Sequence, residues 1–272
     1  SKVWQSTSRG GLPKIFLENL NFEKYADFII NMPLLFLNKV NKVVSAKGKT
    51  FNDYMLGNIK EIKKQKVDYI IHCGDIAHTK TQISPEFVEL CSDFFRNLAE
   101  IAPTYIILGN HDGNLRNFSR QDALSPIVEA LDIPNLHLAK NSSQIALESP
   151  FSLNVLSIFD KDNWDLDLDE EKINIALYHG AVKGAKTDVG YILEHGDVDI
   201  ETLKRFDYAF LGDIHKTNQR LDSRGKIRYA GSTVQQNHGE TDDKGFLIWE
   251  ILGKKTYSVE HISLKNPKPF RT

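Results

Sequence analysis

Residues 67–78 have the sequence VDYIIHCGDIAH, in which a short apolar run ends in Gly74 and Asp75 and a histidine follows three residues later, at His78. An apolar run of this length predicts a buried β-strand, here Val67–Ile71. Glycine lets the backbone turn sharply at a strand end, and the polar side chains behind it then point out of the sheet edge. The sequence therefore predicts polar groups at the carboxyl edge of a sheet.

Three further apolar runs end in the same way. They lead into Gly109-Asn110-His111-Asp112, Tyr178-His179-Gly180 and Gly212-Asp213-Ile214-His215. One such motif alone is ordinarily a turn, and one histidine alone is ordinarily a packed or surface residue. Four of them along one chain favour a metal site over turn chemistry.

The remaining pattern predicts an α/β fold formed by a single domain. Further buried strands are expected at Leu34–Leu37, Tyr105–Leu108, Leu153–Ile158, Ile173–Tyr178 and Tyr208–Leu211. Crossover helices are expected at Phe51–Gln65 and Ser84–Ile101, so the first strands form parallel βαβ units. Strand-like segments at Ile227–Tyr229, Gly245–Ile251 and Thr256–Ile262 predict a C-terminal meander or second sheet.

Composition limits the function classes that fit this chain. Its 34 basic and 36 acidic side chains give a net charge of −2 over 272 residues, so any contact with nucleic acid must be local. Cys73 and Cys91 lack the spacing of a zinc knot or a disulfide framework. With no apolar run of membrane-spanning length and no secretory signal pattern, we expect a soluble cytoplasmic protein without a membrane partner.

The side chains of the four motifs indicate a type of chemistry. Carboxylate, amide and imidazole groups together suit a divalent ion such as manganese, iron, magnesium or zinc, and one aspartate can bridge two ions. Two such ions would hold a phosphodiester and activate water for in-line attack. The pattern therefore predicts phosphoester hydrolysis.

The order GDxxH, GNHD, HG and GxxH resembles the calcineurin-like metallophosphoesterase superfamily, over residues 34–262. The resemblance implies a four-layer α/β/β/α sandwich of two mixed β-sheets flanked by helices. His78, the segment 229–233 (YAGST) and the segment 236–240 (QNHGE) are similar to the SbcD branch of double-strand-break-repair nucleases and to phage recombination nucleases. For a phage source, the compartment would be the host cytoplasm.

The resemblance implies the metal ligands. Asp75 would bridge two ions, Asn110 and His179 would bind the second ion, and His215 would bind the first. Asp213 stands where family members commonly have histidine, and a carboxylate there favours magnesium or manganese. We therefore expect Mn²⁺, with Mg²⁺ as the alternative, as one or two ions.

The resemblance also implies catalytic roles for three residues. His111 would stabilise the phosphate or protonate the leaving oxygen, which an imidazole can do near neutral pH. His78 would orient the phosphate, and Asp112 would accept a hydrogen bond from His111.

The first motif of the superfamily, D-x-H at the end of the first strand, is absent before Asp75. Aligning Leu34–Leu37 with that strand places Lys39 and Asn41 in the two ligand positions. An ammonium beside the site would weaken or exclude the first ion. A pseudonuclease, a one-metal enzyme and a different alignment of the N-terminal region all remain open.

For domain organisation, we expect an extension over residues 1–31, a phosphoesterase domain over 32–265 and a tail over 266–272, where SbcD-like proteins continue into a capping domain. The expected function is metal-dependent exo- or endonuclease activity on DNA ends, in repair or recombination, with an SbcC-type, SMC-like ATPase as partner. A homodimer through Phe118 and the helix Ala123–Leu131 stays open. The alternatives are a degenerate pseudonuclease that binds DNA or scaffolds the ATPase, and a phosphatase or phosphodiesterase of a non-nucleic-acid substrate.

Overall fold

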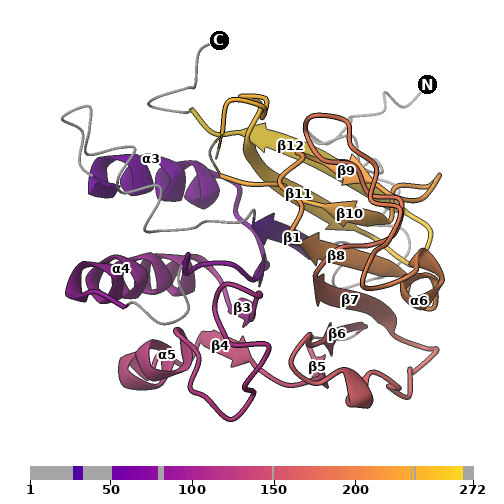
Figure 1. Cartoon of the computed structure of the whole chain (residues 1–272), viewed down its shortest axis with the longest axis horizontal. Coiled ribbons are helices and arrows are strands. Elements are labelled where there is room, and N and C mark those ends of the chain that lie inside the picture. Colours follow the sequence, from indigo (N-terminus) through magenta and orange to yellow (C-terminus); the bar gives the residue numbers. More distant parts are fainter. Residues whose placement is uncertain are drawn as a thin grey trace, which may run out of the picture.

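Two six-stranded β-sheets are stacked face to face in the computed structural model of the protein (Figure 1). The structure describes residues 27–32, 51–78, 83–148, 150–233, 235 and 237–265. Three helices lie on the outer face of the first sheet, and they are α3 (Phe51–Lys64), α4 (Pro85–Ile101) and α5 (Ser125–Leu131). The outer face of the second sheet is covered by the short helix α6 (Ile200–Lys204) and by loops.

The first sheet has the strand order β12-β11-β1-β2-β3-β4. These strands are β1 (Asp27–Met32), β2 (Tyr69–Cys73), β3 (Thr104–Ile107), β4 (Leu136–Ala139), β11 (Gly245–Ile251) and β12 (Tyr257–Ser263). The strands β1 to β4 run parallel to one another, whereas β11 pairs antiparallel with both β1 and β12. This is a mixed sheet.

The second sheet has the strand order β5-β6-β7-β8-β10-β9. These strands are β5 (Ser143–Ala146), β6 (Phe151–Leu156), β7 (Ile173–His179), β8 (Tyr208–Gly212), β9 (Gln219–Arg220) and β10 (Ile227–Tyr229). The four central strands are parallel, and β5 and β9 pair antiparallel at the two edges. A 3-10 turn, η1 (Lys161–Asn163), follows β6.

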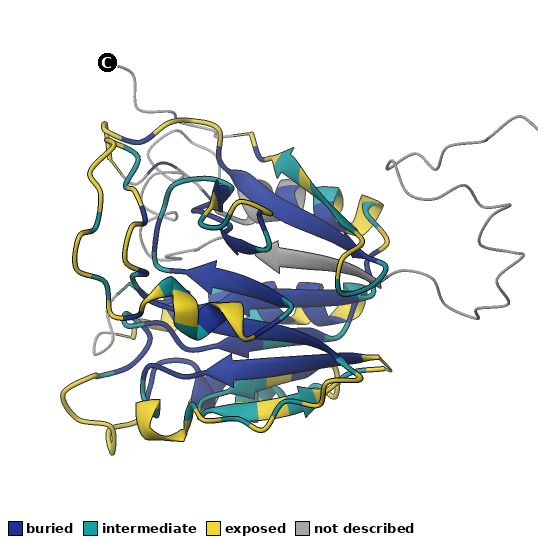
Figure 2. Ribbon diagram, turned by 90° about the vertical axis from the view of Figure 1, so that its right-hand side faces the viewer, coloured by how far each residue is buried: buried dark blue, intermediate teal, exposed yellow. Residues whose placement is uncertain are grey.

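Alternation along β2 explains why this segment becomes a buried strand. Tyr69 and Ile71 join the apolar core between the two sheets, while Ile70 joins the core under the helices. Figure 2 shows the strands as largely buried and the helices with exposed outer faces. Helix α4 begins where the side chain of Ser84 accepts a hydrogen bond from the N–H of Phe87, with Pro85 in the first turn.

The predicted four-layer arrangement of two mixed sheets is confirmed, with a fourth layer that is mostly loop. The C-terminal strands differ from the expectation: β10 belongs to the second sheet, whereas the β11–β12 hairpin completes the first sheet beside β1. Within the described part of the chain, no helix combines the length and apolarity needed to cross a membrane.

The expected first strand, Leu34–Leu37, lies outside the described residues, and another segment occupies the position beside β2. The strand that pairs in parallel with β2 is Asp27–Met32, with Asn31 opposite Ile71 and Met32 opposite His72. Residues 27–31, which we expected in an extension, are therefore part of the first sheet. Asp27 and Asn31 dilute the apolar signal of this segment, and its place between two strands is set by pairing partners far away in sequence. Leu34–Leu37, Lys39 and Asn41 lie outside the described residues, as do residues 1–26 and 266–272.

Candidate metal centre

Strand ends from both sheets meet at one place. Asp75 follows β2, His179 is the last residue of β7, and Asp213 follows β8. One ligand atom from each of these three residues lies within 4.8 Å of those of the other two. The structure thus brings together three of the five predicted metal ligands, although they come from two different sheets.

Glycines allow this close approach. A Cβ atom on Gly109 would lie 2.2 Å from Asp75 Oδ1, and one on Gly212 would lie 2.0 Å from the carbonyl oxygen of Cys73. Atoms cannot approach so closely, so any side chain at either position would push the strand ends apart.

Both carboxylate residues have an unusual backbone. Asp75 has φ 58° and Asp213 has φ 97°, the left-handed region that non-glycine residues rarely occupy. Such backbone strain persists only where surrounding contacts impose it, and it concentrates at functional sites.

His179 is oriented as a metal ligand. Its Nδ1 donates a hydrogen bond to the carbonyl oxygen of Cys73 at 2.6 Å, which leaves the lone pair of a neutral ring on Nε2. Nε2 lies 3.4 Å from Asp75 Oδ1 and 3.8 Å from Asp213 Oδ1. It is buried without a hydrogen-bond partner among the described residues, and a divalent ion would satisfy it together with both carboxylates.

The pKa values of the three clustered residues agree with a divalent-ion site. Burial alone lowers the pKa of His179, but the Asp75 carboxylate, with help from Asp213, raises it to about 9. Burial also works against ionisation of Asp75, yet His179 and the N–H of His111 keep its pKa below the ordinary value. Burial raises the pKa of Asp213. The buried Asp75 carboxylate and the partly buried Asp213 carboxylate face one imidazole, and positive charge stabilises such a site.

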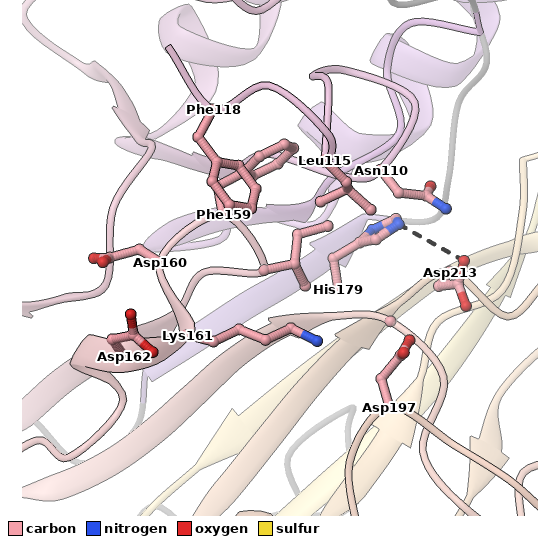
Figure 3. A pocket seen from close by; sticks show the side chains of 12 residues that line it. Asn110, Leu115, Phe118, Phe159, Asp160, Lys161, Asp162, His179, Asp197 and Asp213 are labelled. Carbon is pink, nitrogen blue, oxygen red and sulfur yellow. Dashed lines mark ion pairs between the residues drawn. The ribbon is translucent and has the colours of Figure 1, made fainter.

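The other two predicted ligands lie beside this cluster. Asn110 lines the same cavity as His179 and Asp213 (Figure 3). His215 is outside the group of three, and its Nδ1 contacts Glu240 Oε1 at 2.8 Å.

Glu240 belongs to a buried charge network. Its other carboxylate oxygen lies 3.2 Å from Nζ of Lys244, whose side chain is fully buried. The Lys244 ammonium also donates to the carbonyl oxygen of His215 at 2.9 Å and lies 3.3 Å from Asp188. Glu240 therefore fixes the orientation of the His215 ring, and Lys244 balances the charge of Glu240. From the sequence, Glu240 was noted only as part of the segment 236–240, with no role assigned. Nothing in the sequence indicated a role for Lys244.

His111 and His78, the two predicted catalytic histidines, lie next to each other. Nδ1 of His111 donates to the carbonyl oxygen of His78 at 2.9 Å, and the two rings stack with centroids 5.5 Å apart. The N–H of His111 also donates to Asp75 Oδ1 at 2.9 Å. The backbone thus holds the His111 ring in place through Nδ1.

The predicted role of Asp112 is wrong. Its carboxylate accepts hydrogen bonds from four backbone N–H groups, those of Asp75, Ile76, Ala77 and Gly109, at 2.7–2.9 Å. The partner of the His111 ring is instead the carbonyl oxygen of His78. Burial and the Asp75 carboxylate raise the pKa of Asp112 to about 7, against the effect of these donors. Asp112 therefore joins the two ligand-bearing turns rather than supporting the imidazole.

The correction to the first strand also moves the first-motif positions. Counted at the end of β1, the D-x-H spacing falls on Asn31 and Pro33 rather than on Lys39 and Asn41, with Pro33 beyond the described strand. Residues 28–50 contain no Asp, Glu, His or Cys. The absence of the first motif thus follows from either alignment.

Known proteins resemble this chain in sequence and fold. The family model for calcineurin-like phosphoesterases matches residues 49–219. Uncharacterized protein R555 of Acanthamoeba polyphaga mimivirus is 39% identical over 203 residues, which are 70% of this chain but 15% of that protein. The SbcD component of the SbcCD nuclease of Staphylococcus epidermidis is 25% identical over 247 residues, 78% of this chain and 63% of that protein.

A solved structure of GAP50, the anchor in the inner membrane complex of Plasmodium, has a TM-score of 0.58 at 14% identity, covering 91% of this chain and 88% of that one, and it shows a shared fold alone. The family match spans more than half of the 272 residues and contains all four strand-end motifs and the clustered residues Asp75, His179 and Asp213. The chain belongs to the calcineurin-like phosphoesterase family.

Proposed function

We propose that this protein is a divalent-metal-dependent phosphodiesterase that cleaves DNA at its ends, working as the nuclease component of an SbcC-type ATPase complex. The observation that carries the proposal is the buried Nε2 of His179, directed at two carboxylates beside the His111 ring. The similarity to the SbcD nuclease supports DNA as the substrate and an SbcC-type ATPase as the partner. Mn²⁺ suits the set of oxygen and nitrogen ligands, with Mg²⁺ as the alternative.

Asp75, His179, Asp213 and Asn110 would hold the ion. When bound, the ion would polarise the phosphoester and favour attack by water. The chain itself supplies a proton through Nε2 of His111, because Nδ1 of that ring is committed to the carbonyl oxygen of His78. Stacking against His78 limits rotation of the ring, so the proton is directed at one place, the oxygen that leaves phosphorus.

The test is an Mn²⁺-dependent cleavage assay on linear duplex and single-stranded DNA. We expect the wild-type protein to cut, and His111→Ala to reduce kcat by roughly 10²- to 10⁴-fold with little change in metal affinity. His179→Ala should abolish metal binding and cleavage together. Hydrolysis of phosphoserine peptides with no cleavage of DNA would overturn the proposal in favour of a phosphatase.

A pseudonuclease is the second candidate, and the lack of any acidic or imidazole side chain between residues 28 and 50 favours it. The matched test replaces Asn31 by Asp and Pro33 by His in one variant, which restores the D-x-H spacing at the end of β1. Cleavage by this variant but not by the wild-type protein would establish the second candidate. Cleavage by the wild type would exclude it.

A further inference from the structure

A cavity of about 500 Å³ opens directly from the candidate metal centre (Figure 3). Asn110, His179 and Asp213 form one side of it, and the apolar side chains of Leu115 and Phe118 line another. Volumes of this order hold small organic groups. A phosphodiester bound at the metal centre would therefore place one of its two substituents in this cavity.

The apolar side of the cavity presents an aromatic ring. Phe118 is 58% exposed, and its ring meets that of Phe159 edge to face, with centroids 6.3 Å apart. Phe159 sits closely against the turn after β3, because a Cβ on Gly113 would lie 2.8 Å from its ring. The Phe159 ring is thus packed beside the site, while the Phe118 ring is exposed. This arrangement suits stacking of a planar group on Phe118.

The charged side chains that line the cavity favour a nucleobase over a second phosphate as its occupant. Asp162 and Asp197 line it as well as Asp160, whose carboxylate accepts from the N–H of Ser142. Lys161 also lines the cavity, with its ammonium 5.8 Å from the centroid of the Trp164 ring, so the carboxylates outnumber this one cation. Three carboxylates oppose a phosphate, but they can accept hydrogen bonds from the amino and ring N–H groups of a nucleobase.

Positive charge lies next to Phe118 on the outer surface. Arg116 and Arg120 are exposed, and neither forms an ion pair with another residue in the described part of the chain. Flanking cations around an exposed aromatic ring are typical of surfaces that bind single-stranded nucleic acid.

We infer that the cavity holds the unstacked base of the nucleotide attached to the scissile phosphate, with Phe118 as its stacking platform. The inference rests on the proposed function and narrows its substrate class to polynucleotides with an unpaired nucleotide at the cleavage point. A base inside a duplex has both faces covered by its neighbours, so it must leave the stack to reach the cavity.

The experiment compares wild type, Phe118→Ala, Phe118→Tyr and the control Val88→Ala, an exposed apolar residue on α4 away from the cavity. The substrates are a single-stranded oligonucleotide and an abasic oligonucleotide of equal length, assayed with Mn²⁺. Binding of both is also measured by fluorescence anisotropy with Ca²⁺, so that affinity is known without turnover. Light scattering on each variant reports the oligomeric state.

For the base-bearing oligonucleotide, we expect Phe118→Ala to raise KM and Kd roughly tenfold or more with little change in kcat. Phe118→Tyr should restore both values because a phenol ring stacks equally well, and Val88→Ala should match the wild type. No variant should alter the values for the abasic oligonucleotide.

Three results would overturn the inference: Phe118→Ala leaving KM and Kd unchanged, equal losses on both substrates, or loss of a dimer on Phe118→Ala, which would make this face a contact between two copies. Failure of the wild type to cleave either substrate counts against the proposed function alone, because the binding comparison still tests the base site.

Discussion

Asp112 shows what a single carboxylate does in this site. Each of its oxygens accepts two backbone N–H groups, Oδ1 those of Ile76 and Ala77, and Oδ2 those of Asp75 and Gly109. The family resemblance implied that Asp112 accepts a hydrogen bond from the neighbouring His111. The N–H groups of a buried loop need hydrogen-bond acceptors. Here four of them use the Asp112 carboxylate, which therefore does not serve the His111 ring.

We predict that Asp112→Asn lowers the free energy of unfolding by about 2–4 kcal/mol, because in either orientation the amide NH₂ faces two backbone N–H donors. Urea denaturation of the metal-free protein measures this change. Asp93→Asn, at a half-exposed side chain on α4, should change the free energy by less than about 0.5 kcal/mol. An unchanged unfolding curve combined with a reduced kcat would instead support a direct role at His111.

At the level of secondary-structure elements, the candidate site was predictable where it depends on the alignment of parallel strand ends within one sheet. Parallel strands bring their carboxyl ends to one edge of a sheet, so the motifs after β7 and β8 had to approach each other. The motif after β2 belongs to the other sheet, and its approach depends on how the two sheets stack. The contact of Glu240 with His215 was not predictable, because it depends on a turn packing against a loop 25 residues away in sequence. The first strand was missed because pairing with β11 and β2, rather than local apolarity, selects Asp27–Met32.

Helix α5 depends on a buried acid that precedes it. Asp122 accepts hydrogen bonds from the N–H groups of Leu124 and Ser125 and from the Ser125 hydroxyl, and it pairs with Lys140 at 2.9 Å. Burial alone raises its pKa, but these hydrogen bonds hold the pKa below the ordinary value. The depressed pKa means that the folded state favours the charged form.

A pH prediction follows for Asp122→Asn. The carboxylate stabilises the fold above the unfolded-state pKa of about 3.9, and this contribution disappears as pH falls through the lower folded-state pKa. At pH 7 the variant should lose about 1–2 kcal/mol of unfolding free energy, and the gap to wild type should close below about pH 4. Urea titrations from pH 3 to 7 measure the gap, and a difference that does not depend on pH would contradict this account.

For the whole molecule, metal binding and folding should be linked. The three clustered ligands come from both sheets, so an ion held between them joins the two halves of the fold. An ion that binds only the folded state stabilises it by about 2.7 kcal/mol at 100 times its Kd.

We therefore predict that Mn²⁺ raises Tm by about 5 °C or more, and that chelation reverses this shift. Calorimetric titration should give about one ion per chain, because the clustered ligands form one site and residues 28–50 offer no carboxylate, imidazole or thiolate ligand. His179→Ala should abolish the shift in Tm, while His195→Ala, on an exposed loop, should retain it. Binding of two ions with similar affinity would show that the first site has ligands from elsewhere in the chain.

The position of β1 has a consequence for how the chain folds. This strand pairs with β11 on one side, so that Asp27 lies opposite Ile251, and almost the whole domain separates the two partners in sequence. Contacts so distant along the chain form slowly, since a large loop must close before they contribute. During synthesis, the edge of β1 that pairs with β11 therefore stays unpaired until residue 251 has been synthesised. Until then, this edge can pair with strands of other chains.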